Sequence, residues 1–219
     1  MYQADIEQFV REYDANSLPD SRYASFDYCY NYFHGDKDET RDLEKSCLVL
    51  GFYLASWGMF RGSSFILQKS VRHFKSTIQY IDSLPKSVWN IDVDNYTSET
   101  IKIILEIYNN VKRLMVPIGR KDTTLVTKVL LGVFGFIPAF DDNFCKTFKM
   151  IFPEQCGFTV VNVNSLSCIY QFFISNQQVI NKLSNELYTI EFMTGLKTNI
   201  PYPRAKVIDM YGWQKAFLS

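Results

Sequence analysis

Residues 97–117, TSETIKIILEIYNNVKRLMVP, decide the fold class of this chain. Apolar residues recur there at steps of three and four, which puts them on one face of a helix. They are Ile101, Ile104, Tyr108, Val111 and Met115. Thr97 or Ser98 is suited to cap the start of this helix, and Pro117 stops it.

Similar apolar stripes predict helices elsewhere in the chain. Their faces are Leu67, Val71, Phe74, Ile78 and Ile81, then Leu125, Val129 and Val133, then Phe144, Phe148 and Ile151. Residues 40–60 and 164–187 also have helical patterns, whereas only Phe158–Val163 is typical of a strand. We therefore predict a mainly α fold, in which residues 1–219 form a single compact domain of at least six helices. Two helical lobes are the alternative, divided at the polar stretch 90–96.

Composition excludes several classes of protein. The chain is 47% hydrophobic and has no net charge, so it is not a disordered polymer. Its five cysteines are widely spaced and form no CxxC pair, and its two histidines are too few to complete a zinc site. We therefore expect free thiols rather than a disulfide framework, and we expect no metal and no cofactor.

Nothing in the sequence is typical of a membrane protein. The first residues, MYQADIEQFVREYD, lack the basic start and the apolar run of a signal peptide. The longest apolar stretches, Cys47–Phe60 and Val129–Phe140, are too short to cross a bilayer. We expect a cytoplasmic protein with no membrane partner.

Charge is distributed unevenly along the chain. Residues 1–45 hold eleven acidic and five basic side chains, a balance of −6. Residues 46–91 and 102–128 each have a balance of +4. A basic middle segment can attract an anionic ligand such as DNA, or it can be neutralised within the fold by the acidic amino-terminal segment.

The turn WGMFRGSS at residues 57–64 is a candidate phosphate site. Arg61 can bind phosphate through its guanidinium group, and Ser63 or Ser64 would start a helix whose free N–H groups also attract anions. The alternative is structural, with Gly62 allowing the turn and Ser63 only capping the helix.

A second candidate site lies around Asp141. Residues 128–144, KVLLGVFGFIPAFDDNF, join an apolar helix to a loop that contains Pro138, and Asp141 stands at the start of the next helix. This stretch resembles the helix–hairpin–helix DNA glycosylase family, in which a proline and a catalytic aspartate precede a helix in this way. The tripeptide GRK at residues 119–121 corresponds to the hairpin in this resemblance. Alternatively, Asp141 or Asp142 is an ordinary helix cap.

The resemblance implies an enzyme that binds DNA and cleaves the N-glycosidic bond of a modified base. Asp141 would stabilise the positive charge that develops on the sugar, and Lys121 would be the nucleophile. The phosphate-binding residues would be Arg61, Ser63, Lys112, Arg113, Gly119 and Arg120. Aromatic candidates for stacking on the extruded base are Tyr28, Tyr30, Tyr32 and Trp57.

Two other functions fit the same residues. One is a non-enzymatic helical scaffold that binds a partner, with the acidic amino-terminal segment covering the basic middle of the chain. The other is an enzyme that acts on a small nucleotide and holds its phosphate at the Arg61 turn. Salt-sensitive binding of DNA would favour the glycosylase-like function over the scaffold.

The remaining ionisable residues are assigned no chemistry. His34 and His73 have no carboxylate or cysteine at ligand spacing, so neither is expected to bind a metal or to form a catalytic triad. Asp209 lies in an apolar part of a predicted last helix, where a lone charge needs a basic partner. The candidate partners are Arg204, Lys206 and Arg61.

Overall fold

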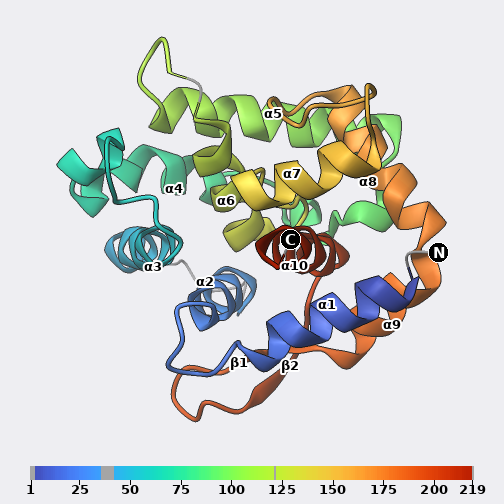
Figure 1. Ribbon diagram of the computed structural model, residues 1–219. Helices are drawn as coiled ribbons and strands as arrows, with labels where there is room; N and C mark the ends of the chain where they lie inside the picture. The colour runs from blue at the N-terminus through green and yellow to red at the C-terminus, as the bar shows by residue number, and fades with distance from the viewer. Residues whose placement is uncertain (1–2, 36–41, 121, 219) are drawn as a thin grey trace.

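The computed structural model describes residues 3–35, 42–120 and 122–218, and these residues are mainly α-helical (Figure 1). The α-helices are α1 (Gln3–Ala15), α2 (Ala24–His34), α3 (Leu43–Ser56), α4 (Lys75–Asp82), α5 (Ser98–Met115), α6 (Thr123–Phe134), α7 (Asp142–Ile151), α8 (Val163–Ser175), α9 (Gln177–Glu186) and α10 (Arg204–Phe217). Short 3₁₀ segments between α3 and α5 are Phe65–Gln68, Val71–Phe74, Lys86–Asn90 and Val93–Asn95. The strands are β1 (Tyr188–Ile190) and β2 (Lys197–Pro201). The predicted fold class is therefore confirmed.

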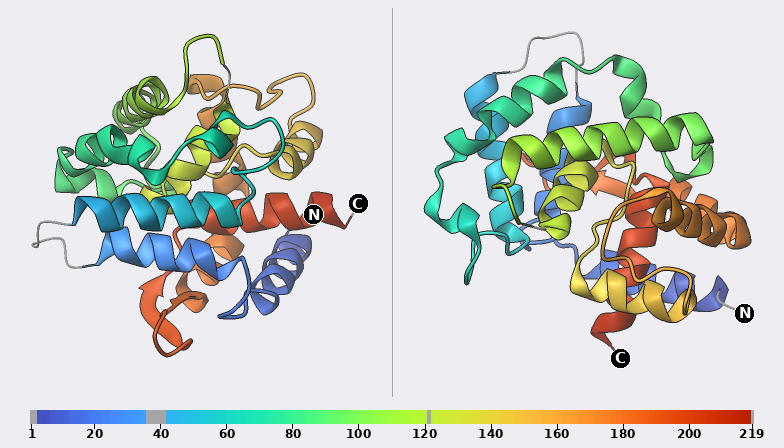
Figure 2. Two further views of the ribbon diagram at one scale, coloured as in Figure 1. Left: turned by 90° about the vertical axis from the view of Figure 1, so that its left-hand side faces the viewer. Right: turned by 90° about the horizontal axis from the view of Figure 1, so that it is seen from above.

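Helix α10 lies at the centre of the structure, where Figure 1 shows it end-on. It packs against α1, α7 and α9, so the last helix joins elements from both halves of the sequence. Gly212 makes the contact with α7 close, since a Cβ atom at this position would lie 2.6 Å from the Phe144 ring. Figure 2 shows α2 and α3 side by side, and both also contact α6.

Helix α6 after its first two residues, and the loop that follows it up to Phe140, are buried without interruption. Every residue from Leu125 to Phe140 is buried. Gly135 ends the helix in the left-handed conformation, with a φ of 70°, and a Cβ atom there would lie 2.7 Å from Pro203. Close packing therefore fixes the path of the loop that leads to Asp141.

Most of the predicted helix faces are confirmed. Helix α5 begins after Thr97, whose side chain accepts a hydrogen bond from the Thr100 N–H, and it ends at Met115. All the apolar residues predicted for its face are buried. Helices α3, α6 and α7 also lie within segments that were predicted to be helical.

Residues 63–82 do not form the single helix that their apolar stripe predicts. The α-helix begins only at Lys75, and extended backbone at Ser70 separates two 3₁₀ turns before it. Leu67 is consequently 47% exposed, so its predicted burial with Phe74 is wrong. Serine readily adopts such non-helical conformations, and apolar spacing alone does not exclude them.

The regular structure near the carboxyl terminus also differs from the prediction. Residues 158–163 form no strand, because Phe158 has a φ of 50° and α8 already begins at Val163. The strands lie at residues 188–201 instead, where β1 and β2 form an antiparallel hairpin between α9 and α10. The helical segment predicted up to residue 187 is divided at Asn176, whose φ of −130° separates α8 from α9.

Most of the buried apolar side chains form one contiguous cluster, which extends from Ile6 in α1 to Tyr211 in α10. The polar stretch 90–96 contributes to it, since Val93 and Tyr96 are buried. The Tyr96 hydroxyl also donates a hydrogen bond to a carbonyl oxygen in the loop after α6. Among the residues described, no helix is both long and apolar enough to span a bilayer.

Candidate functional site

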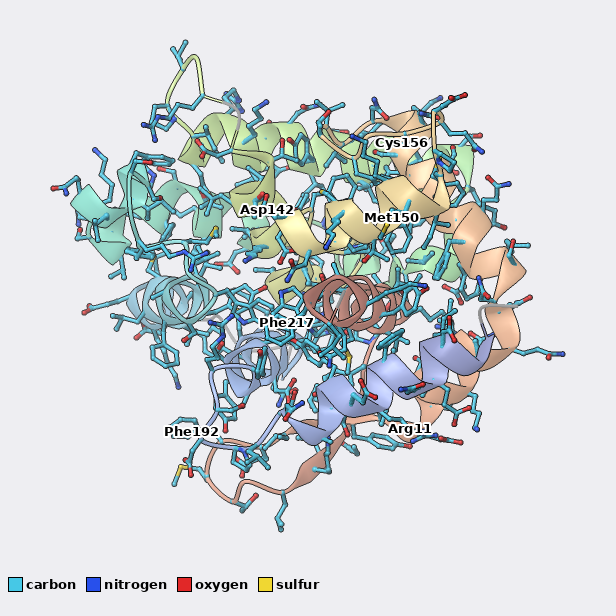
Figure 3. The ribbon with its side chains drawn as sticks, in the orientation of Figure 1. Arg11, Asp142, Met150, Cys156, Phe192 and Phe217 are labelled. Carbon is cyan, nitrogen blue, oxygen red and sulfur yellow. The ribbon has the colours of Figure 1, made fainter. Side chains whose placement is uncertain are left out.

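A pocket of about 520 Å³ lies where the starts of α6 and α7 meet the turn after α3. Its charged lining residues are Arg22, Arg61, Arg120, Lys128, Asp122, Asp141 and Asp142. Figure 3 marks the position by Asp142, in the first turn of α7 and next to α6. The pocket therefore brings together the Arg61 turn and Asp141, which the sequence suggested as two separate candidate sites.

Asp141 caps the start of α7 and lines this pocket. Its Oδ1 accepts a hydrogen bond of 3.0 Å from the Phe144 N–H. Its Oδ2 lies 3.8 Å from Nζ of Lys128, and the Asp141 side chain is 15% exposed. One carboxylate therefore caps a helix with one oxygen and pairs with a lysine through the other.

Lys128 belongs to the buried segment of α6, and its side chain is only 6% exposed. Its Nζ donates a hydrogen bond of 3.0 Å to the carbonyl oxygen of Trp57 and lies 5.4 Å from the centre of the Trp57 ring. The backbone of Lys128 is held as well, since its carbonyl oxygen accepts a hydrogen bond of 3.1 Å from the Tyr53 hydroxyl. These contacts hold the ammonium group in the wall of the pocket.

Burial shifts the protonation of both members of this pair. Loss of hydration lowers the pKa of Lys128, and the negative charges of Asp141 and Asp209 act against this decrease. Loss of hydration raises the pKa of Asp141, and the positive charge of Lys128 acts against this increase. Each group is thus closer to its neutral form than it would be in water, as is common for groups that transfer protons or act as nucleophiles.

Three arginines line the same pocket. The guanidinium carbon of Arg22 lies 5.4 Å from the centre of the Tyr23 ring, and that of Arg120 lies 5.4 Å from the centre of the Phe65 ring. Arg61, in the turn after α3, is exposed. Guanidinium groups that rest on aromatic rings keep their N–H groups available, and they are suited to bind phosphate.

Two tryptophans, Trp57 and Trp213, also line the pocket. Trp57 is 6% exposed, and its Nε1–H has no acceptor among the residues described. The tyrosines predicted to stack on a base, Tyr28, Tyr30 and Tyr32, are not among the lining residues. Of the aromatic candidates named from the sequence, only Trp57 therefore reaches this site.

The structure brings some of the predicted phosphate-binding residues to the pocket. Those that line it are Arg61, Ser63 and Arg120. Those that do not are Lys112, Arg113 and Gly119, which lie at the end of α5 and in the turn after it. No α-helix begins at Ser63 or Ser64; a 3₁₀ helix of four residues, Phe65–Gln68, follows Ser64, whose side chain makes no capping hydrogen bond. Lys121, the predicted nucleophile, lies outside the described residues.

Asp209 is paired with one of its three candidate partners. Its Oδ2 lies 3.0 Å from Nζ of Lys206, and both side chains are almost fully buried, at 4% and 2% exposed. Its Oδ1 accepts a hydrogen bond of 3.0 Å from the Ala139 N–H. Asp209 therefore binds the loop that leads to Asp141.

Neither histidine joins this site. His73 lies with Nε2 2.9 Å from the carbonyl oxygen of Met115, and His34 stacks on Tyr30 with ring centres 3.9 Å apart. Within the described ranges, His, Cys, Asp and Glu side chains form no group of three that could hold a metal ion. The cysteines are free thiols.

Comparisons with known proteins do not identify the chain. No family model matches it, and no match was found among curated proteins or solved structures. The resemblance to helix–hairpin–helix glycosylases thus stays a prediction, and the function has to be inferred from the pocket.

Proposed function

We propose that this protein cleaves the N-glycosidic bond of a base in DNA, with Lys128 as the nucleophile and Asp141 as the stabilising carboxylate. The observation that carries the proposal is the buried Lys128–Asp141 pair in a pocket lined by three arginines. Lys128 takes the role that the sequence suggested for Lys121, because Lys128 is the lysine that lies beside the carboxylate.

The amine of Lys128 suits nucleophilic attack because burial lowers its pKa and so increases its neutral fraction near pH 7. In the proposed step, Nζ forms a bond to C1′ of the sugar while the bond between C1′ and the base breaks. The electron pair of that bond leaves with the base. The proton released by the attacking amine neutralises the base. In the C1′ adduct the bond between C1′ and the ring oxygen then breaks, the nitrogen lone pair forms a protonated Schiff base, and the ring oxygen takes up a proton from water to become a hydroxyl group.

The carboxylate of Asp141 can stabilise the positive charge that develops on the sugar during the reaction. Breaking the N-glycosidic bond places positive charge on C1′ and on the ring oxygen of the sugar. Oδ2 of Asp141 is directed to Lys128 rather than to the helix, so it is available to stabilise that charge. The same oxygen can accept the proton that Lys128 loses during the attack and pass it to the departing base.

The rest of the pocket suits a nucleotide. Arg22, Arg61 and Arg120 supply guanidinium groups for phosphate oxygens. Trp213, which is half-buried, supplies an aromatic ring that an extruded base can contact. The volume of about 520 Å³ lies within the range of pockets that bind small organic molecules, about 300–1,000 Å³.

Borohydride trapping tests the nucleophile. The protein is mixed with DNA duplexes that contain an abasic site or one oxidised, alkylated or deaminated base, and borohydride reduces any Schiff base to a stable crosslink. We expect wild-type protein to be crosslinked to DNA, with the modified peptide containing Lys128. Lys128→Gln should abolish the crosslink, and Lys121→Gln should retain it. A crosslink that persists in Lys128→Gln would contradict the assignment.

Asp141→Asn tests the carboxylate. Asparagine caps helices as well as aspartate does, and Lys128 keeps its hydrogen bond to the Trp57 carbonyl oxygen, so the variant should fold and its DNA affinity should stay close to wild type. The rate of base release should fall at least about 100-fold, as it does when an enzyme loses a group that stabilises charge in the transition state. An unchanged rate would show that Asp141 is only a cap.

Binding measurements separate the two alternative functions. Absence of DNA binding at low salt would favour the scaffold, for which the supporting observation is the exposed apolar tip of the β1–β2 hairpin (Figure 3). This tip consists of Phe192, Met193 and Leu196, which are 70%, 82% and 68% exposed. Cleavage of free nucleotides without cleavage of DNA would favour the small-nucleotide enzyme.

A further inference from the structure

Side chains from two helices hold the loop between α6 and α7. The Ala139 N–H donates a hydrogen bond of 3.0 Å to Oδ1 of Asp209, which belongs to α10. The next N–H group, that of Phe140, donates a hydrogen bond of 2.9 Å to Oγ1 of Thr127, which belongs to α6. The backbone just before Asp141 therefore depends on two polar side chains for its position.

Asp209 is also one half of a buried ion pair. Nζ of its partner Lys206 lies 3.0 Å from Asp209 Oδ2 and between 4.6 and 4.8 Å from the ring centres of Tyr13, Phe26 and Trp57. Removing two charges from water is costly, and an apolar pair of similar size is often equally stable or more stable. Stability therefore gives no reason for an ion pair at this place.

The ion pair contacts the segments that hold the two members of the proposed catalytic pair. Asp209 binds the loop that ends at Asp141. Lys206 lies against the Trp57 ring, and the carbonyl oxygen of Trp57 accepts the hydrogen bond from Lys128. Asp209 and Lys206 are thus placed to act on the Lys128–Asp141 pair from behind the pocket.

We propose that Asp209 is a positioning residue for the Lys128–Asp141 pair. It holds the loop before Asp141 through the Ala139 N–H group, and its carboxylate pairs with Lys206, which packs on the same Trp57 ring as Lys128. This inference rests on the proposed function, because it concerns the same site. It adds a residue that does not line the pocket.

The charges around the pair give the direction of the effect. Burial lowers the pKa of Lys128 most strongly, while Asp141 and then Asp209 raise it. For Asp141, burial raises the pKa, Lys128 lowers it, and Asp209 raises it. Arg22, Arg61 and Asp142 also act on the pair. Other charged groups near it are Arg120 and Asp122, which line the same pocket, and Lys206, which lies on the Trp57 ring as Lys128 does. Loss of the Asp209 charge should therefore lower the pKa of Lys128 further.

Pyridoxal 5′-phosphate measures the reactivity of Lys128 without DNA. Its aldehyde forms a Schiff base with a neutral amine, its phosphate suits the arginines of the pocket, and borohydride fixes the product for mass spectrometry. The rate of labelling at Lys128 is measured from about pH 6 to about pH 10, a range that includes lysine pKa values lowered by burial. Absence of labelling at Lys128 in the wild-type protein would overturn the inference.

Two single variants separate charge from hydrogen bonding. Asp209→Asn keeps an acceptor for the Ala139 N–H and removes the charge, so the midpoint of labelling should move to lower pH by at least about half a unit. Thr127→Val removes the acceptor for the Phe140 N–H without changing any charge, so its midpoint should shift less than that of Asp209→Asn. Equal midpoints in Asp209→Asn and wild type would overturn the role of the charge.

Two double variants test the loop if Asp209→Asn leaves Lys206 unpaired and unfolds the protein. In Asp209→Asn/Lys206→Met both charges are absent and the Ala139 N–H keeps its acceptor. In Asp209→Leu/Lys206→Met that acceptor is lost. Base release should be at least about tenfold slower in the second variant than in the first, because a misplaced catalytic group reduces the rate steeply. Equal rates in two folded variants would overturn the positioning role.

The outcomes for the proposed function and for Asp209 can be told apart. A shifted labelling profile in Asp209→Asn, together with no cleavage of any DNA substrate, would count against the glycosylase function and leave the effect of Asp209 on Lys128 intact. Cleavage of DNA with an unshifted profile would count against Asp209 alone.

Discussion

Phe148 is one of the buried side chains that hold α7, and hence Asp141, in place. Helix α7 has only 10 residues, too few for a stable isolated helix, so packing has to hold it in place. Phe148 is fully buried, and its ring centre lies 4.3 Å from that of Phe144 and 4.9 Å from that of Phe172. A Cβ atom at Gly212 would lie 3.2 Å from the Phe148 ring, so α7 and α10 are in close van der Waals contact at this point.

Phe148→Ala should therefore cost about 3–5 kcal/mol of the free energy of unfolding, since a rigid aromatic cluster cannot collapse to fill the space. For a chain of 219 residues, each kcal/mol corresponds to about 2–4 °C in melting temperature, so the midpoint should fall by roughly 6–20 °C. Thermal melting followed by circular dichroism measures the midpoint, and urea titration measures the free energy. Base release should fall as well, because α7 positions Asp141.

Met150→Ala is the matched control on the same helix. Met150 is 55% exposed, so its loss should change the free energy of unfolding by no more than about 0.5 kcal/mol. A cost below about 1 kcal/mol for Phe148→Ala, or equal costs for the two variants, would mean that the buried face of α7 is assigned wrongly.

Three further predictions concern other parts of the fold. Gly132→Ala should destabilise the protein by about 1–3 kcal/mol in urea titration, because a Cβ atom would lie 2.4 Å from the Tyr53 ring. Burial raises the pKa of Asp27 to about 7 from 3.8, so this group stabilises the fold fully below about pH 4 and loses its contribution as the pH rises to about 7. Asp27→Asn should therefore weaken the loss of stability with rising pH, and equal pH dependence in variant and wild type would refute the assignment. Cys29 should resist maleimide in the native protein and react after unfolding, because its thiol is buried and burial raises its pKa; rapid native labelling would contradict its burial.

Helices could be predicted from the sequence where an apolar stripe had a capping residue before it and a helix-terminating residue after it. Helix α5 has such a stripe together with Thr97 before it and Pro117 after it, and the prediction holds at both ends. Residues 67–81 have an equally regular stripe, but Ser70 interrupts the helix within it. Apolar spacing shows which residues can share a face, and it does not show whether the backbone between them is helical.

The β1–β2 hairpin could not be predicted from the sequence, because its strands have no alternating apolar pattern. Strand β1 has only 3 residues, and β2 has no buried residue along its length. Polar groups of α2 hold β1 instead, since Asp27 accepts a hydrogen bond from the Ile190 N–H and Asn31 donates one to the Ile190 carbonyl oxygen. These partners are more than 150 residues apart in sequence, so no local pattern reveals them.

The candidate site was predictable only in part, for a related reason. Asp141 and the Arg61 turn have local signals, a proline before a helix start and a glycine-flanked arginine. Lys128 has a weaker signal: it is the one charged residue in the stretch 125–140. Its partners are Trp57 and Asp141, which approach it only when α3, α6 and α7 have packed together. A single lysine in an apolar helix is therefore worth testing as a pocket residue.

The two interpretations of Asp141, a helix cap and a reacting carboxylate, use different atoms. The cap requires only Oδ1, which accepts the hydrogen bond from the Phe144 N–H. The pairing with Lys128 uses Oδ2. An aspartate at this position thus gains a fixed orientation from the helix, because the bond at Oδ1 determines where Oδ2 points. Capping is then a means of aiming the carboxylate into the pocket, and a helix cap beside a buried lysine is a stronger candidate for catalysis than either feature alone.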